Sequence, residues 1–268
     1  MTIQRNKQQS LVVELDMSTF QPTLAASASG TPVPATNDAL NPRASIASAL
    51  HTIALLAFLA GWAYFGRARA IHMRAQAVPN HLVFYLPTFV MEWSVFAYIV
   101  WGVRKRGISL RELVGPRWSK GIANFKDFGF AACFELVAVP ILAVTGHLLH
   151  IDPKGQSTRF MMPAGAAEIG AWILLSFTAG ICEETIFRGY LQRQFAGWTK
   201  SAVAGVLISA ALFGAGHIYQ GWKQTIVIGV FGAMFGTLAV LRRSLKPGMI
   251  AHSFQDAVAG IVFGLMGK

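Results

Sequence analysis

The chain has 268 residues, of which 54% are hydrophobic and only 13% carry a charged side chain. Soluble domains carry about 25% charged residues, and the mean hydropathy here is +0.47. The composition therefore excludes an ordinary soluble domain and indicates a polytopic membrane protein. The formal net charge of +11 would by itself suggest a nucleic-acid partner. The basic residues cluster between apolar runs, however, as the positive-inside rule predicts, so we expect no nucleic-acid partner.

Residues 1–44 are rich in Ser, Thr, Ala, Pro and Asn and contain no apolar core of a signal peptide. This composition predicts a disordered N-terminal tail. The two cysteines, Cys133 and Cys182, both lie in apolar runs. They resemble neither a disulfide framework nor a zinc site.

The remainder predicts an all-α fold, a polytopic membrane bundle of about seven transmembrane helices, since a span needs about 20 apolar residues. Residues 45–160 hold the N-terminal helices and residues 165–266 a denser helical core. A short interfacial helix is expected at 109–114, turns at 197–199 and 242–248, and a polar loop at 152–159. The expected spans are 45–65, 81–103, 128–149, 164–184, 202–217, 225–241 and 249–266.

Most of the 23 Lys and Arg residues fall on one side of this arrangement, in the tail and in the turns 104–120, 193–200 and 242–246. Arg67, Arg69 and Arg74, expected to follow the first span, lie on the other side. The positive-inside rule then places the N-terminus in the cytoplasm. We expect a multi-pass protein of the plasma (inner) membrane.

The stretch from Cys182 to Tyr190 follows an apolar run and contains Glu183, Glu184 and Arg188. Ionisable side chains retained near the bilayer core are functional candidates by default. Glu184 and Arg188 lie four residues apart on a helix and can pair. Glu183 projects about 100° away, which would leave it free for chemistry. The structural alternative is a capped helix end with a snorkelling arginine.

Two further motifs follow. Phe213-x-x-x-His217 ends one predicted span, and His252-x-x-x-Asp256 lies early in the last one. A lone membrane histidine is more often a packing or hydrogen-bonding residue than a catalyst, and a His/Asp pair can satisfy itself. Together the motifs place one Glu, two His and one Asp inside an apolar bundle, which structural needs rarely require.

In this order and spacing the three motifs resemble the CAAX-protease and bacteriocin-processing family, also called the ABI family, of intramembrane glutamic endopeptidases. The resemblance covers residues 165–266, and the first 160 residues carry no motif of the family. It implies hydrolysis of a peptide bond in a membrane-associated peptide or protein, within or near the bilayer. It further implies roles for the residues of the three motifs: Glu183 as the general base, His217 positioning the water, His252 and Asp256 stabilising the oxyanion, and Glu184, Arg188 and Phe213 in support.

Position 256 departs from the Asn expected in the eukaryotic prenyl-protein proteases. An ionised Asp cannot donate a hydrogen bond to an oxyanion. Either Asp256 is protonated, or it orients His252 and leaves that histidine as the donor.

Other readings stay open. Glu, His and Asp are plausible zinc ligands, but no His-Glu-x-x-His pair is present, and the resemblance implies a mechanism without metal or other cofactor. A non-catalytic immunity or scaffold protein on the same fold is a second alternative, and a transporter with a proton relay is a third. The substrate, its prenylation and the oligomeric state are not readable.

Two more carboxylates, Glu92 and Glu135, lie inside predicted spans of the first half and match no family motif. Since intramembrane charges are usually paired, we expect each to pair with an Arg or His across the bundle, with a gating role as the alternative.

The three motifs are hard to bring to one depth. Glu183 and His217 can meet in a hairpin of helices, whereas His252 lies only a few residues beyond the basic turn 242–246. We therefore expect an element between residues 180 and 222 to be broken, tilted or re-entrant. The candidate break points are Gly180, Gly189 and Gly197.

Overall fold

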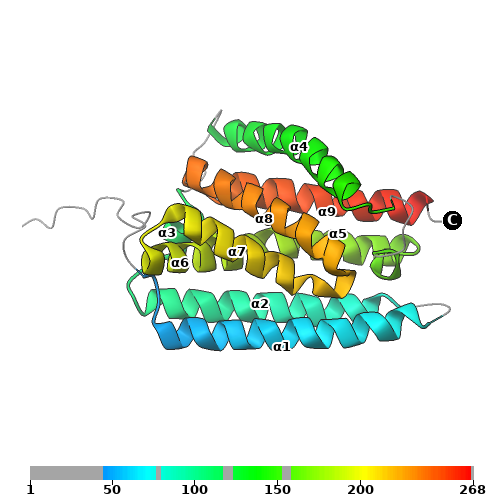
Figure 1. Ribbon diagram of the computed structural model, residues 1–268, viewed down its shortest axis with the longest axis horizontal. Coiled ribbons are helices and arrows are strands. Elements are labelled where there is room, and N and C mark those ends of the chain that lie inside the picture. The colour runs from blue at the N-terminus through cyan, green and yellow to red at the C-terminus, as the bar shows by residue number, and fades with distance from the viewer. Residues whose placement is uncertain (1–44, 77–79, 117–122, 153–157, 267–268) are drawn as a thin grey trace, which may run out of the picture. The chain divides into compact units, whose positions relative to one another are not determined.

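The computed structural model describes residues 45–76, 80–116, 123–152 and 158–266, and all regular elements in these ranges are helices (Figure 1). The all-α prediction is confirmed. The predicted tail 1–44 and residues 153–157 of the predicted polar loop lie outside the described residues.

Six helical runs of the described chain are long and apolar enough to cross a membrane, so the chain is a multi-pass membrane protein. A seventh apolar helix, α7, has only 15 residues, fewer than the roughly 20 that a crossing needs. The prediction of about seven spans thus resolves into six candidate spans and one shorter helix. The six runs are α1 (Ala49–Arg74), α2 (Leu82–Arg104), α4 (Ala123–Leu148), the run Ala166–Thr199, α8 (Trp222–Arg242) and α9 (Lys246–Met266), and α7 is Ala202–Gly216.

The run Ala166–Thr199 is a continuous helix of 34 residues. It consists of α5 (Ala166–Glu183), the π-helical segment η3 (Glu184–Leu191) and α6 (Gln192–Thr199). The chain is helical at all three glycines proposed as break points, so that prediction was wrong. In place of a break, the helix widens into a π-helix, a feature that is rare and often found at functional sites.

Two other features bring the motifs to one depth. Helix α7 ends early, and the single turn η4 (Ile218–Gln220) leads the chain back into α8. Helix α9 also lies beside α5 rather than beside α6 (Figure 1). His252, near the start of α9, is therefore level with Glu183 at the end of α5.

Several predicted boundaries move. Helix α1 continues to Arg74, so the three arginines expected after the first span lie within its last turns. The turn expected at 197–199 falls one step later, at Lys200, whose φ is 58°. Pro247 and Gly248 belong to the first turn of α9, where a proline is tolerated because its nitrogen needs no partner there.

The basic turns predicted to share one side of the membrane meet at one end of the bundle. Gln194 of α6 accepts a hydrogen bond from the backbone nitrogen of Ile46 (2.8 Å). The nitrogen of Leu245, between α8 and α9, donates to the carbonyl of Val114 (2.8 Å). Val114 ends α3 (Leu110–Val114), the expected short helix, which begins with a capping box. These bonds confirm that the basic turns lie at the same end of the bundle. That this end faces the cytoplasm stays a prediction.

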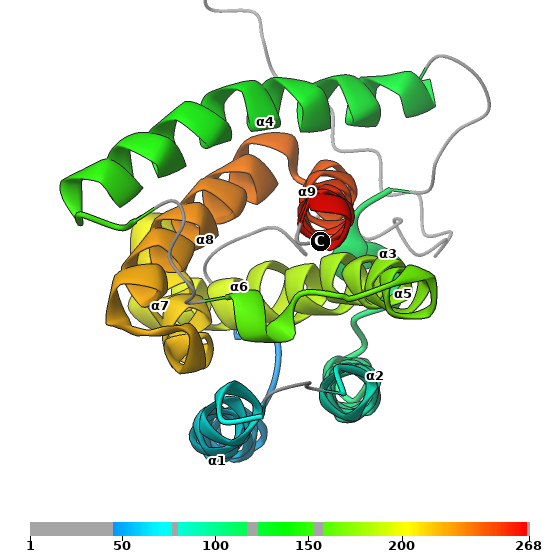
Figure 2. The same ribbon diagram turned by 90° about the vertical axis from the view of Figure 1, so that its right-hand side faces the viewer.

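Helix α5 occupies the middle of the bundle. Figure 2 shows it between α2 on one side and α9 on the other, with α4 outside, against α8 and α9. At the α5–α9 crossing, a Cβ on Gly180 would meet Ser253 Oγ and would lie 2.8 Å from the carbonyl oxygen of Met249. The helices are thus close because this position has no side chain.

We predict that Gly180→Ala lowers the free energy of unfolding by about 1–3 kcal/mol, because the added methyl pushes the backbone of α9 away from α5. Gly170→Ala is the matched control on the same helix, since its Cβ would meet nothing within 4 Å. Thermal unfolding of the purified protein in detergent measures both. Equal unfolding temperatures for the two variants would contradict this account of the crossing.

Candidate active site

The π-helical segment η3 is buried along its whole length and is held by polar bonds from neighbouring helices. The Tyr190 hydroxyl bonds Nδ1 of His51 on α1 at 2.7 Å. The Ser209 hydroxyl of α7 donates to the carbonyl of Phe187 at 2.7 Å. These bonds fix the rotation of the segment, and with it the direction in which Glu183 and Glu184 project at its start.

The predicted pair of Glu184 and Arg188 is present. Glu184 Oε1 lies 2.9 Å from Arg188 Nη1, and each side chain is 1% exposed. Arg188 also donates to the carbonyl of Gly232 at 3.2 Å and lies over the ring of Phe213 at 4.3 Å. The charge of Glu184 is therefore neutralised inside the protein, and this carboxylate has little access to a substrate.

His252 lies among three carboxylates. Its Nδ1 is 3.2 Å from Glu184 Oε1, while its Nε2 is 3.7 Å from Glu183 Oε2 and 3.6 Å from Asp256 Oδ2. Because Glu184 is an acceptor paired with Arg188, the hydrogen of this bond belongs to Nδ1. The two distances at Nε2 exceed the range of a hydrogen bond, so Nε2 is not committed to either carboxylate.

His217 ends α7, as the sequence predicts. Its Nδ1 is 2.9 Å from the carbonyl oxygen of Phe213. A carbonyl only accepts, so Nδ1 carries the hydrogen, and Nε2 of the neutral ring is left as an acceptor. The Phe213 ring contacts His217 and His252 edge-on, with centroids 4.9 and 6.1 Å apart. Phe213 therefore connects the two histidines.

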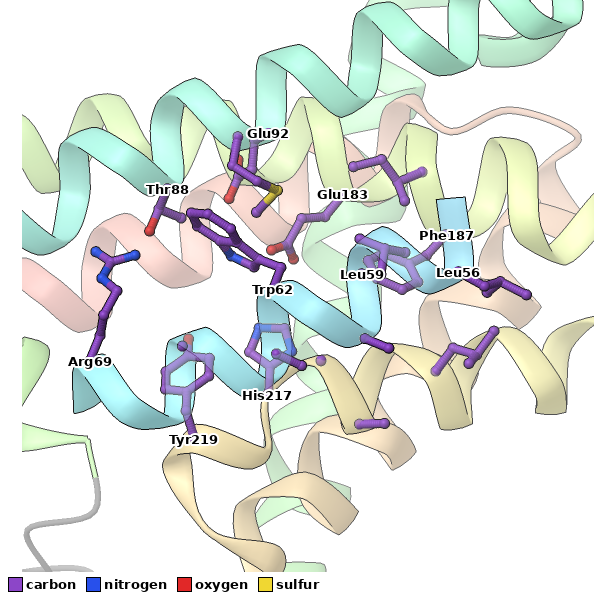
Figure 3. A pocket seen from close by; sticks show the side chains of 18 of the residues that line it. Leu56, Leu59, Trp62, Arg69, Thr88, Glu92, Glu183, Phe187, His217 and Tyr219 are labelled. Carbon is purple, nitrogen blue, oxygen red and sulfur yellow. The ribbon is translucent and has the colours of Figure 1, made fainter. Parts of the chain in front are cut away.

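A cavity of about 380 Å³ opens beside Glu183, between α1, α2, the start of η3, α7 and η4. Figure 3 shows the side chains of Glu183, Glu92 and His217 directed into it, near the indole of Trp62. Its wall is mainly apolar. The Glu183 side chain is 16% exposed and faces both this cavity and His252.

The structure brings all seven predicted residues into one cluster around Glu183: Glu183, Glu184, Arg188, Phe213, His217, His252 and Asp256. His252 and Asp256 are not among the residues that line the cavity. The part of the wall that α1 and η4 supply, including Trp62, Arg69 and Tyr219, was not predicted from the sequence. No motif marks these residues, because the approach of α1 to η4 is a matter of packing.

The ion pairs expected for Glu92 and Glu135 are not found among the described residues. Glu92 is 2% exposed, and its Oε2 is buried without a hydrogen-bond partner, as is Oε1 of Glu135. That prediction was wrong because no basic side chain of the described chain lies within ion-pair distance of either carboxyl.

Within the described residues, no group of three or more His, Cys, Asp or Glu side chains is arranged to hold a metal ion.

Residues 165–258 match the family model described as Rce1-like, type II CAAX prenyl endopeptidase. Neither a curated protein nor a solved structure matches the chain. The matched segment begins at the start of α5 and ends within α9, so it contains all three motifs. The match confirms the resemblance drawn from those motifs: the segment 165–258, which holds every predicted site residue, matches the Rce1-like CAAX-protease family model.

Proposed function

We propose that this protein is an intramembrane endopeptidase that hydrolyses a peptide bond of a membrane-associated peptide or protein with water activated by Glu183. One observation carries the proposal: Glu183 shares a mainly apolar cavity with His217, while its neighbour Glu184 is paired with Arg188. The family match supports the same reaction class.

The two adjacent glutamates have different environments and therefore different roles. Glu184 is 1% exposed and held by Arg188, so its part is structural and electrostatic. Glu183 has no arginine or lysine partner among the described residues and reaches the cavity. It is the carboxylate that can take a proton from a water molecule there.

His217 positions that water. Its Nε2 accepts one hydrogen of the water, since Nδ1 is bonded to Phe213, and Glu183 removes the other hydrogen. The water oxygen then forms a bond to the scissile carbonyl carbon. A positioned general base contributes about 10²–10⁴-fold to the rate.

His252 supplies the oxyanion donor. Its Nδ1 hydrogen is held by Glu184, so Nε2 donates to the oxyanion when the ring carries a second proton. Asp256, at 3.6 Å from Nε2, favours that charged ring. This assigns Asp256 the orienting and charge-stabilising role rather than that of a donor, and it explains how an Asp can serve where the family resemblance leads one to expect Asn. Such donors act because they are in place before the charge forms.

We predict that Glu183→Gln lowers kcat/KM about 10³-fold, because the amide cannot take the proton of the water. The assay uses the full chain in detergent and a library of quenched fluorescent peptides, with and without a C-terminal prenyl group. Glu135→Gln is the control, an intramembrane carboxyl outside the cavity, and is expected to stay within about fivefold of wild type. Equal cleavage by wild type and Glu183→Gln would remove Glu183 as the base. A folded wild type that cleaves no peptide would favour a binding protein.

We predict that Arg188→Met lowers the free energy of unfolding by about 3–5 kcal/mol, because it leaves Glu184 charged and buried without its arginine. The double variant Glu184→Leu/Arg188→Met recovers most of this loss but stays inactive, since His252 has lost the partner of its Nδ1. Thermal unfolding and peptide cleavage measure the two effects. A double variant no more stable than the single one would show that the pair is not coupled.

We predict that dialysis against 1,10-phenanthroline leaves peptide cleavage unchanged, because the proposed mechanism uses no metal. The control is a known zinc protease in the same detergent. Loss of activity that added Zn²⁺ restores would establish the zinc alternative instead.

A further inference from the structure

Glu92 of α2 is a second carboxyl group in the cavity of Glu183. It is 2% exposed, its Oε2 has no hydrogen-bond partner, and it forms no ion pair with the described residues. Figure 3 shows its side chain and that of Glu183 directed into the same space. The proposed mechanism so far gives Glu92 no part.

Arg69, which also lines the cavity, does not pair with Glu92. The Arg69 guanidinium donates to the carbonyl oxygens of Phe84 (2.7 Å) and Val83 (3.3 Å), and it lies 4.6 Å from the ring centroid of Phe84. The other titratable groups that line the cavity are Glu183, His217 and Tyr219. Cys182 and Asp256 interact with Glu92 electrostatically from further away. None of these groups supplies a positive charge at hydrogen-bond distance.

An ionised carboxylate without a partner is costly in such a site, and a buried group avoids the cost by keeping its proton. Two carboxyl groups that share one site also disfavour a second negative charge. One carboxyl that is ionised and one that holds a proton is the pairing that hydrolases use for base and acid.

Peptide hydrolysis needs such an acid, because a peptide nitrogen departs as an amine only when it gains a proton as the C–N bond breaks. Among the described side chains, three N–H donors lie around the cavity. His217 Nδ1 is bonded to the Phe213 carbonyl, Arg69 is bonded to carbonyls of α2, and the indole N–H of Trp62 is too weak an acid to give up its proton. The carboxyl of Glu92 is not committed.

We propose that Glu92 is the general acid of the reaction, a role that rests on the proposed endopeptidase function. Water attacks the carbonyl carbon and gives one proton to Glu183. The tetrahedral intermediate then collapses: the carbonyl re-forms, the C–N bond breaks, and the Glu92 proton passes to the departing nitrogen. The proton on Glu183 returns to Glu92 through water, so each cycle consumes one water molecule and both carboxyls regain their starting states.

The experiment compares two substrates of one acyl sequence: a fluorogenic peptide that wild type cleaves, and the 4-nitrophenyl ester of the same acyl group. The nitrophenolate leaves as a stable anion and needs no proton. Glu92→Gln, which has the same shape but no acidic proton, is expected to lower kcat/KM about 100-fold for the peptide and less than about threefold for the ester. Glu92→Asp, which keeps the acid, is expected to recover part of the peptide activity.

The controls separate this role from others. Glu183→Gln is expected to lose both activities. Glu135→Gln is expected to leave kcat/KM unchanged for both the peptide and the ester. Equal losses on both substrates with Glu92→Gln, or no loss on either, overturns the proposal while leaving the proposed function intact. A wild type that cleaves neither substrate overturns both.

A second measurement is independent of activity. A buried protonated carboxyl gives a carbonyl stretching band in the infrared spectrum at neutral pH. We expect wild type to show a band that is absent in Glu92→Gln and retained in Glu135→Gln. Identical spectra for wild type and Glu92→Gln would mean that Glu92 is ionised and cannot be the acid.

Discussion

The ion pair of Glu184 and Arg188 is the interaction on which the rest of the site depends. Both groups are buried, with 2.9 Å between their nearest polar atoms, so removing either one would leave a buried charge that destabilises the fold. The pair also positions neighbouring side chains. Its carboxylate holds Nδ1 of His252, and its guanidinium lies over Phe213, whose carbonyl holds His217. One buried charge pair thereby positions two histidines from two other helices, and it leaves Glu183 as the glutamate that faces the cavity.

The backbone around this pair is arranged to bring polar groups together without exposing them to lipid. The π-helical segment Glu184–Leu191 keeps its backbone bonds within the helix, which a bilayer requires, while its wider turn changes the direction of the side chains. The absence of a side chain at Gly180 lets α9 approach α5 closely. The short helix α7 ends beside the cavity, so His217 lies on the cavity wall.

Hydrolysis inside a bilayer requires water and proton carriers in an apolar enclosure. In the proposed mechanism, the apolar wall of the cavity limits competing water, and the carboxyls and His217 are the polar groups that hold one water molecule and accept its hydrogens. The proposed division places the base on α5 and the acid on the neighbouring helix α2. The segment that matches the protease family, residues 165–258, would then receive one catalytic group from a helix outside the match.

The sequence by itself determined the membrane class, the all-α fold and the approximate spans, because apolar length is a local property. Through the resemblance of its three motifs, it also indicated which residues form the site: Glu183, Glu184, Arg188, His217, His252 and Asp256. It also determined the Glu184–Arg188 pair, since residues four apart on one helix must be neighbours. The tertiary structure alone decided the π-helical segment in place of a break, the position of α9 that brings His252 to Glu183, and the lack of an ion pair for Glu92 among the described residues. These features depend on how helices distant in sequence pack against one another, and the pattern along a single helix does not contain that information.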